Sequence, residues 1–182
     1  RNAHARRLIA QAGYGPDNPL QIELRFNTND LHRRIALAIQ AMWKEELGVE
    51  TVLINEEFQV LLANIRAAEV TQVFRSSWLG DYNDAHTVLS IMQSGHTSNT
   101  PRYSNEEFDS LMESAATQTN PDLRRSYLEE AERALLSDHA VIPIYFLVSK
   151  HLVSPDVRGW GDNVLDYHYS HHLSLAPAEA AP

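Results

Sequence analysis

Apolar and polar residues follow two different periods near the start of the chain, and each period predicts a different element. Residues 20–26 alternate apolar and polar side chains, which places the even-numbered ones on one buried face of a strand. Over residues 31–47 the apolar side chains recur at helical spacing. Asn29 or Asp30 is a suitable N-cap for this helix, and Gly48 is a suitable stop. The pattern therefore predicts a strand followed directly by a long helix.

A β-rich run over residues 49–54 follows this helix and completes a strand, helix, strand unit. Such a unit forms a right-handed crossover between parallel strands. A short helix over residues 3–12 is expected before it, and a helix over 57–69 with a third strand over 71–75 is expected after it. The order of elements predicts an α/β fold.

The second half of the chain is predicted to be mainly helical. Residues 85–92 form a short helix, and Ser104 to Glu107 resembles a capping box before a helix that ends near Thr117. Pro121 suits the first turn of another helix, which ends near Ser137. The apolar stripe expected on that helix consists of Leu123, Tyr127, Ala131, Ala134 and Leu135.

Two further segments differ in pattern from the helices. Residues 140–148 are an almost continuous apolar run, which is typical of a strand covered on both faces. Residues 154–182 form a weakly patterned extension that is rich in Gly, Asp and His. No internal repeat or linker divides the chain, so residues 1–182 are expected to form a single domain.

Composition narrows the class of protein. The chain has 182 residues, of which 43% are hydrophobic, and no apolar run approaches the roughly 20 residues that a bilayer span requires. The net charge is −9 and the basic residues are scattered, which argues against nucleic acid as a partner. The lack of cysteine excludes disulfides, thiolate metal sites and a cysteine nucleophile. Because no leader precedes Arg1, we expect that any signal peptide was removed or lies outside this sequence.

The first candidate site combines a cation, an aromatic ring and a carboxylate. Arg75, Trp78 and Asp81 follow the third predicted strand, and ligands of open α/β sheets bind at such strand ends. These side chains suit the two charged ends of a peptide and an apolar side chain between them. The spacing alone favours a simpler alternative, which is a structural Arg–Asp pair beside a core tryptophan.

A second junction of strand and helix lies at residues 27–32, where main-chain N–H groups and the helix dipole favour an anion. Asn27 and His32 could therefore help to hold a carboxylate. The alternative, which the spacing favours, is a plain N-cap with His32 exposed in the first turn.

Several histidines near the end of the chain are candidate metal ligands. His168, His171 and His172 lie close together, but no carboxylate stands at a recognised offset, so incidental surface histidines are the favoured explanation. His139 and His151 flank the predicted strand and are expected to be surface residues. No metal site or cofactor is predicted. Motifs of hydrolases and nucleotide-binding enzymes are absent from the sequence, so no catalytic residue is assigned and the chain is not expected to be an enzyme.

The ordered motifs along the chain resemble one known family, the solute-binding proteins of oligopeptide and dipeptide ABC importers (family 5), which include a murein-tripeptide binder. The most specific element is Arg75-x-x-Trp78-x-x-Asp81-Tyr-Asn83. The other matching segments are residues 12–14, 24–32, 43–49, 103–105 and 143–146. The resemblance covers Arg1 to about Leu175.

This resemblance implies a periplasmic-binding-protein type II-like lobe, in which helices flank a mixed β-sheet. Only the carboxy-terminal lobe of a two-lobed protein is matched, and the amino-terminal lobe is expected to be absent. The residue matched by Asp81 pairs with the amino terminus of the peptide. The main chain of the segment Ser76, Ser77, Trp78 and Leu79 pairs with the peptide as an added strand. Positions matched by Arg75, Arg66, His32 and Asn27 meet the carboxyl end.

The sequence departs from the family pattern at three places. Phe58 replaces a tryptophan that lines a side-chain pocket, and Leu147 replaces a tyrosine. One residue is inserted between Phe58 and Arg66, which weakens the match at Arg66 most.

The function implied is capture of oligopeptides, with murein tripeptide as one candidate, and delivery to the permease subunits of an ABC importer. The protein is expected in the periplasm, or lipid-anchored outside a Gram-positive cell. One alternative is a metal or metal-chelate importer component of the same fold that uses the tail histidines. A peptide hydrolase is a further alternative, which the sequence does not support.

Overall fold

The computed structural model describes residues 2–69 and 72–176, so the predicted strand start at Thr71 lies outside the described residues. The chain divides into two compact units, a first unit of residues 1–77 and a second unit of residues 78–182, and each is described by itself. The prediction that residues 1–182 form a single lobe therefore stays a prediction.

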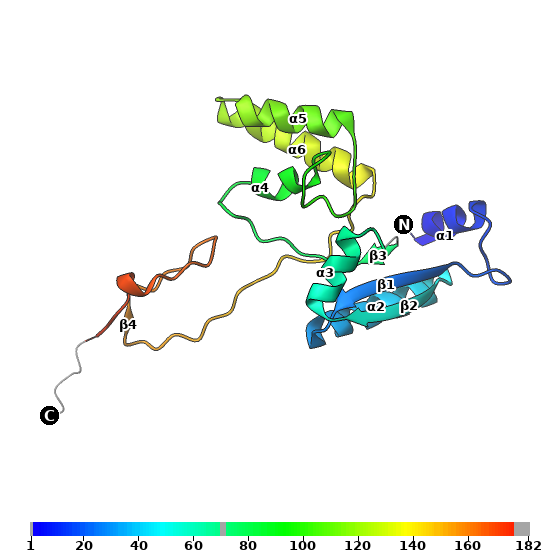
Figure 1. The fold of residues 1–182 in the computed structure, drawn as a ribbon, viewed down its shortest axis with the longest axis horizontal. Helices are drawn as coiled ribbons and strands as arrows, with labels where there is room; N and C mark the ends of the chain where they lie inside the picture. Colours follow the sequence, from blue (N-terminus) through cyan, green and yellow to red (C-terminus); the bar gives the residue numbers. More distant parts are fainter. Residues whose placement is uncertain (1, 70–71, 177–182) are drawn as a thin grey trace. The chain divides into compact units, whose positions relative to one another are not determined.

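The first unit is built on a parallel three-stranded sheet of order β2-β1-β3 (Figure 1). The central strand β1 (Gln21–Asn27) pairs along its whole length with β2 (Glu50–Glu56), and β3 (Val73–Phe74) pairs with its second half. Parallel strands need a crossover, and α2 (Asp30–Leu47) supplies it between β1 and β2. The predicted strand, helix, strand unit and the α/β class are confirmed.

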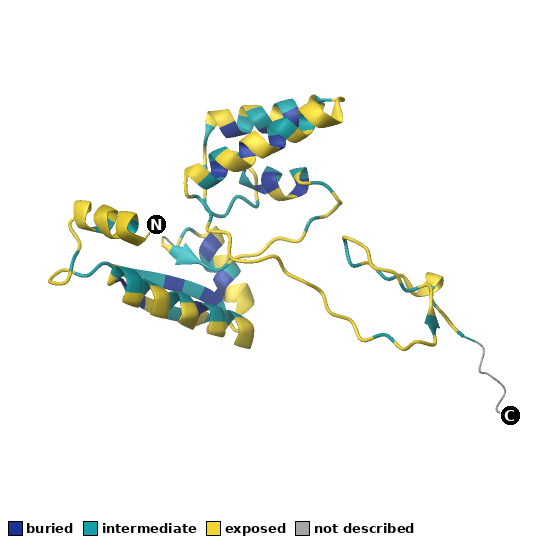
Figure 2. Cartoon of the chain, turned by 180° about the vertical axis from the view of Figure 1, so that it is seen from behind, coloured by how far each residue is buried: buried dark blue, intermediate teal, exposed yellow. Residues whose placement is uncertain are grey.

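The core of the first unit lies between β1 and α2. Leu24 and Phe26 of β1 are buried against Ala36 of α2, while Leu20 and Ile22, on the same face, are half-buried. Figure 2 shows buried and intermediate positions along the long strand of this sheet. The period-two prediction therefore holds most strongly at the carboxyl half of β1, where the sheet has three strands.

The ends of α2 follow the capping chemistry expected from the sequence. The side chain of Asn29 accepts hydrogen bonds from the main-chain N–H groups of Leu31 and His32. Gly48 ends the helix with φ of 71°, a left-handed conformation that favours glycine. The first unit contains two further helices, α1 (Asn2–Gln11), in which no residue is buried, and α3 (Phe58–Arg66).

The second unit has its core between two helices, α5 (Glu106–Thr117) and α6 (Pro121–Ser137), with the short helix α4 (His86–Leu89) and the 3-10 turn η1 (Ser90–Met92) beside them. In Figure 2 the facing sides of α5 and α6 are buried and their outer sides are exposed. The buried side chains of this core are Leu89, Phe108, Met112, Ala115, Leu128, Ala131 and Leu135.

Two details of these helices correct the prediction. The N-cap of α5 is Asn105, whose side chain accepts from Phe108 N–H, and not Ser104 of the expected capping box. The hydroxyl of Ser104 instead accepts a hydrogen bond from the hydroxyl of Ser94 at 3.0 Å. On α6 the buried side includes Leu128 and excludes Leu123, which is 50% exposed. The face of α6 that packs against α5 is therefore rotated about the helix axis relative to the predicted face.

The predicted strand over residues 140–148 is wrong. This segment has no regular structure, and the side chain of Phe146 is 95% exposed. A strand needs a neighbouring strand for its main-chain hydrogen bonds, and no other described segment pairs with this one.

The weakly patterned extension does contain structure. The two-residue strands β4 (Val157–Arg158) and β5 (Ser174–Leu175) pair antiparallel, and the 3-10 turn η2 (Ser170–His172) lies between them. No helix in the described ranges, residues 2–69 and 72–176, has both the length and the apolar character that a membrane crossing demands.

Candidate functional site

Asn27, His32 and Arg75 come together at the carboxyl edge of the first unit's sheet. Asn27 ends β1 and Arg75 directly follows β3, so both lie where parallel strands end. The main-chain N–H of Arg75 donates to the carbonyl of Arg25 at 2.8 Å, which extends the ladder one residue beyond β3. His32 lies in the first turn of α2, and its Nδ1 is 2.9 Å from Oδ1 of Asn27.

His32 is half-buried, and its surroundings keep it uncharged. Burial lowers the pKa of His32 below the ordinary value of 6.5, the charge of Arg75 lowers it further, and hydrogen bonding with the main chain of Asn27 opposes both. When Nδ1 donates to Oδ1 of Asn27, the neutral ring carries its lone pair on Nε2. Arg75 is then the cation of this group of three residues.

The two other residues expected at the ligand on this unit lie at opposite ends of α3. Phe58 begins the helix just after β2 and is 49% exposed. Arg66 ends the helix, about 12 Å away along the axis at 1.5 Å per residue. Phe58 therefore lies near the carboxyl end of β2, and Arg66 lies at the opposite end of the helix.

A charged network that the sequence analysis missed holds α3 to the sheet. Arg25 donates to Glu56 at 3.1 Å and to Glu23 at 2.9 Å, and Asn64 of α3 donates to the same oxygen of Glu56 at 2.8 Å. The side chains of Arg25 and Glu56 are 19% and 13% exposed, so this pairing is largely shielded from water. The alternation of apolar and polar residues in β1 predicts that Arg25 lies on the face opposite the apolar one. No sequence pattern predicts that it pairs with Glu56.

Residues 76–79 form a segment without regular secondary structure that follows β3. Ser76 and Ser77 are exposed, and Leu79 is 70% exposed. Within the described part of the chain, the main-chain N–H and C=O groups of these four residues have no hydrogen-bond partner. Trp78 is 41% exposed, which does not fit the alternative of a core tryptophan. Such a segment offers an edge to which an extended peptide can add.

Asp81 is exposed, and buried Thr87 orients it. The N–H of Asp81 donates to Oγ1 of Thr87 at 3.1 Å, and this hydroxyl lies 3.4 Å from Oδ2 of Asp81. Thr87 is 3% exposed, so its position is fixed by packing. Gly80 permits this approach, because a Cβ at residue 80 would lie 2.9 Å from Cγ2 of Thr87. The carboxylate of Asp81 is therefore held at the surface of the second unit.

The loop that carries Asp81 is anchored by an ion pair that the sequence analysis also missed. Arg124 of α6 donates to both carboxylate oxygens of Asp84, at 2.6 and 2.9 Å. Hydrogen bonding from Arg124 holds the pKa of Asp84 below its ordinary value of 3.8, although partial burial opposes the shift. Asp84 also accepts from the N–H of His86 at 2.8 Å, at the start of α4.

A further group of polar side chains joins the extension to the segment just before it, and we call His151, Asp166 and His168 the tail cluster. Nε2 of His151 and Nε2 of His168 lie 2.7 and 2.9 Å from the same oxygen of Asp166. Hydrogen bonds from Ser149 and the two histidines lower the pKa of Asp166 to about 2. His171 and His172 are outside this cluster and contact each other, with ring centroids 4.0 Å apart.

Comparisons with known proteins identify relatives along almost the whole chain. The family model described as bacterial extracellular solute-binding proteins, family 5 Middle, matches residues 2–100. The periplasmic oligopeptide-binding protein OppA of Escherichia coli K12 is 37% identical over 176 residues, which cover 96% of this chain and 32% of OppA. The periplasmic murein peptide-binding protein MppA of the same organism is 35% identical over 175 residues, with the same coverage of 96% and 32%.

A solved structure agrees with these matches. The crystal structure of Haemophilus influenzae OppA in complex with the peptide RPPGFSPFR superposes with a TM-score of 0.86 at 32% sequence identity. The match covers 96% of this chain and 34% of that protein. The chain thus spans about a third of the length of its curated relatives.

Proposed function

The chain belongs to the family 5 bacterial extracellular solute-binding proteins, and from that premise we propose that it is a carboxy-terminal lobe that captures peptides for an ABC importer. The relatives are periplasmic binding proteins, and the chain is accordingly proposed to act outside the cytoplasm. Under this proposal the lobe works with an amino-terminal lobe of the same protein and delivers the peptide to the permease subunits. The function proposed is binding without catalysis.

The observation that carries the proposal is that an exposed carboxylate closely follows a stretch of main chain without hydrogen-bond partners among the described residues. Thr87 orients Asp81, and residues 76–79 precede Asp81 in the sequence, separated from it by one residue. An α-ammonium group forms a charge-assisted hydrogen bond with such a carboxylate, and the peptide main chain pairs with such an edge. Both contacts use groups that every peptide has, so low sequence specificity is expected.

The opposite end of the peptide is assigned to the first unit. Arg75 supplies the positive charge for a carboxylate, and the neighbouring His32 is uncharged and does not compete for it. Asn27 fixes the ring of His32. Trp78 and Phe58, both partly exposed, are proposed to cover apolar side chains of the peptide.

The proposal is tested by calorimetry on the full-length protein with a pool of short peptides in free and N-acetylated forms. We expect the free peptides to bind, and we expect acetylation or Asp81→Asn to weaken binding roughly thirtyfold or more, since a desolvated charge pair contributes about 2 kcal/mol or more. Asn keeps the size of Asp81 and its contact with Thr87. Asp17→Asn, at an exposed loop residue, is the matched control and should leave the affinity unchanged.

Two results would count against peptide capture. Binding of neither form of the peptides would reject it, and equal affinity of the Asp81→Asn variant would remove Asp81 from the site. A fluorogenic peptide assay addresses the hydrolase alternative, for which we expect no cleavage.

A further inference from the structure

The tail cluster has the geometry of a preformed metal site. Its three ligating atoms, Nε2 of His151, Oδ1 of Asp166 and Nε2 of His168, all lie within 4.8 Å of one another. A zinc ion with bonds of about 2.0–2.2 Å holds tetrahedral ligand atoms about 3.3–3.6 Å apart. The two nitrogens already lie 2.7 and 2.9 Å from the oxygen, so shifts of about half to one ångström would admit an ion.

Neighbouring side chains hold the ligands in place. The indole of Trp160 stacks on the ring of His168, with centroids 3.6 Å apart and planes 9° apart, and contacts His151 edge-on at 5.1 Å. Asn163 closes a turn around Asp166: its carbonyl accepts from Asp166 N–H at 3.0 Å, and its side chain bonds both main-chain groups of Tyr167. Ligands fixed before binding lose little freedom when an ion arrives.

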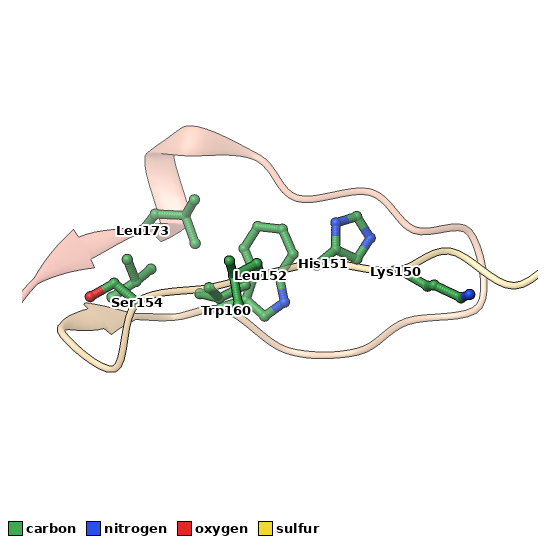
Figure 3. A pocket seen from close by; sticks show the side chains of 8 residues that line it. Lys150, His151, Leu152, Ser154, Trp160 and Leu173 are labelled. Atoms are coloured by element: carbon green, nitrogen blue, oxygen red, sulfur yellow. The ribbon is translucent and has the colours of Figure 1, made fainter.

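The cluster is also accessible. The side chains of His151 and Asp166 are 36% and 37% exposed, while that of His168 is 11% exposed under Trp160. Figure 3 shows His151 and Trp160 among the side chains that line a shallow hollow of about 360 Å³ in this extension. Water and small ions therefore reach the ligating atoms from the surface.

The donor set selects a class of metal. Two imidazoles and one carboxylate suit zinc and its neighbours in the first transition row, whereas Mg²⁺ and Ca²⁺ prefer oxygen ligands alone. A single histidine is sufficient to pair with an aspartate, and here two converge on one oxygen from segments on either side of Trp160. Within residues 2–69 and 72–176 this is the single group of three histidine or acidic side chains near enough to share an ion.

We propose that His151, Asp166 and His168 bind a divalent transition-metal ion of the zinc type, with water in the remaining coordination position. Each neutral ring binds through Nε2 and carries its proton on Nδ1. The site shares no residue with the proposed peptide contacts.

Calorimetric titration of the chelator-treated full-length protein with Zn²⁺ tests this site. We expect one ion per chain at the cluster, with affinity lowered roughly tenfold or more by each of His151→Gln, Asp166→Asn and His168→Gln. Asn suits residue 166 because it also tolerates the left-handed φ of 57° that Asp166 adopts. His171→Gln and His172→Gln are matched controls from the same segment and should change affinity less than twofold.

A second readout uses the unaltered protein, so it does not depend on the folding of any variant. In ¹⁵N spectra of the histidine rings, Zn²⁺ should shift Nε2 of His151 and His168 and leave His171 unmoved. The proposal is overturned by the absence of Zn²⁺ binding, by equal binding in the three cluster variants, or by loss of binding in the His171→Gln control. Asp81→Asn should leave Zn²⁺ affinity unchanged, which separates this result from the outcome for peptide capture.

Discussion

His32 shows how neighbouring groups set the charge of one residue at the sheet edge. Burial and the positive charge of Arg75 both disfavour the imidazolium form, and hydrogen bonding with the main chain of Asn27 compensates only in part. The ring is therefore uncharged at pH 7, and Arg75 alone carries positive charge in this group. Under the proposed function, Arg75 is the residue that meets the peptide carboxylate.

Arg75→Gln is expected to raise the pKa of His32. Removing the cation makes protonation of the ring easier, but burial remains and is the larger cause, so the pKa should stay below 6.5. NMR titration of the His32 ring in both proteins measures the change. Arg33→Gln, a neighbouring exposed arginine on α2, is the control and should have no comparable effect. An unchanged or lower pKa in Arg75→Gln would contradict this description of the group.

Part of this group could be predicted from the sequence. Asn27 and His32 are five residues apart across a strand–helix junction, so local rules bring them near each other. The approach of Arg75 depends on the parallel pairing of β3 with β1, which no local pattern specifies. The support of Asp81 by Thr87, and the need for glycine at Gly80, depend equally on tertiary contacts.

Among the elements of the second unit, the loop before α4 depends on α6 for its position. Arg124 reaches back to Asp84 with two hydrogen bonds, and both side chains are about 30% exposed. A bidentate pair in this partly shielded setting contributes on the order of 1 kcal/mol. It ties the segment that carries Asp81 to the helical core.

Arg124→Gln is expected to lower the free energy of unfolding by about 1 kcal/mol at pH 7, measured by urea denaturation. The pKa of Asp84 is lower in the folded state than its ordinary value of 3.8, so the pair stabilises the fold above that value and the contribution is lost as pH falls through the folded pKa. The difference between wild type and variant should therefore shrink below about pH 4. Arg125→Gln, the adjacent exposed arginine, should change stability by less than half as much. A pH-independent difference would show that the charge pair is not responsible.

Elements with strong local signals were predicted well. β1, α2 and β2 were predicted nearly to the residue, because periodicity and capping act within one segment. Residues 140–148 were predicted as a strand from apolar content alone, and that failed because strand formation also needs a partner. The tail cluster was missed for a similar reason, since the chain must fold back to bring His151 to Asp166.

At the scale of the whole molecule, the chain spans about a third of the length of the curated relatives it matches. Under the proposed function, the candidate peptide contacts are Asn27, His32 and Arg75 in the first unit, and Trp78 and Asp81 in the second. The hydrogen bond between Asn27 and His32 lies within the first unit, and the contact of Asp81 with Thr87 lies within the second. The family match covers residues 2–100, which include all five residues.

The most direct test of peptide capture is the crystal structure of the full-length protein with a bound short peptide. Our account predicts that the peptide ammonium nitrogen lies about 3 Å from the carboxylate of Asp81 and that the peptide main chain pairs with residues 76–79. A peptide whose amino terminus binds elsewhere, with Asp81 and residues 76–79 left in contact with water, would contradict it.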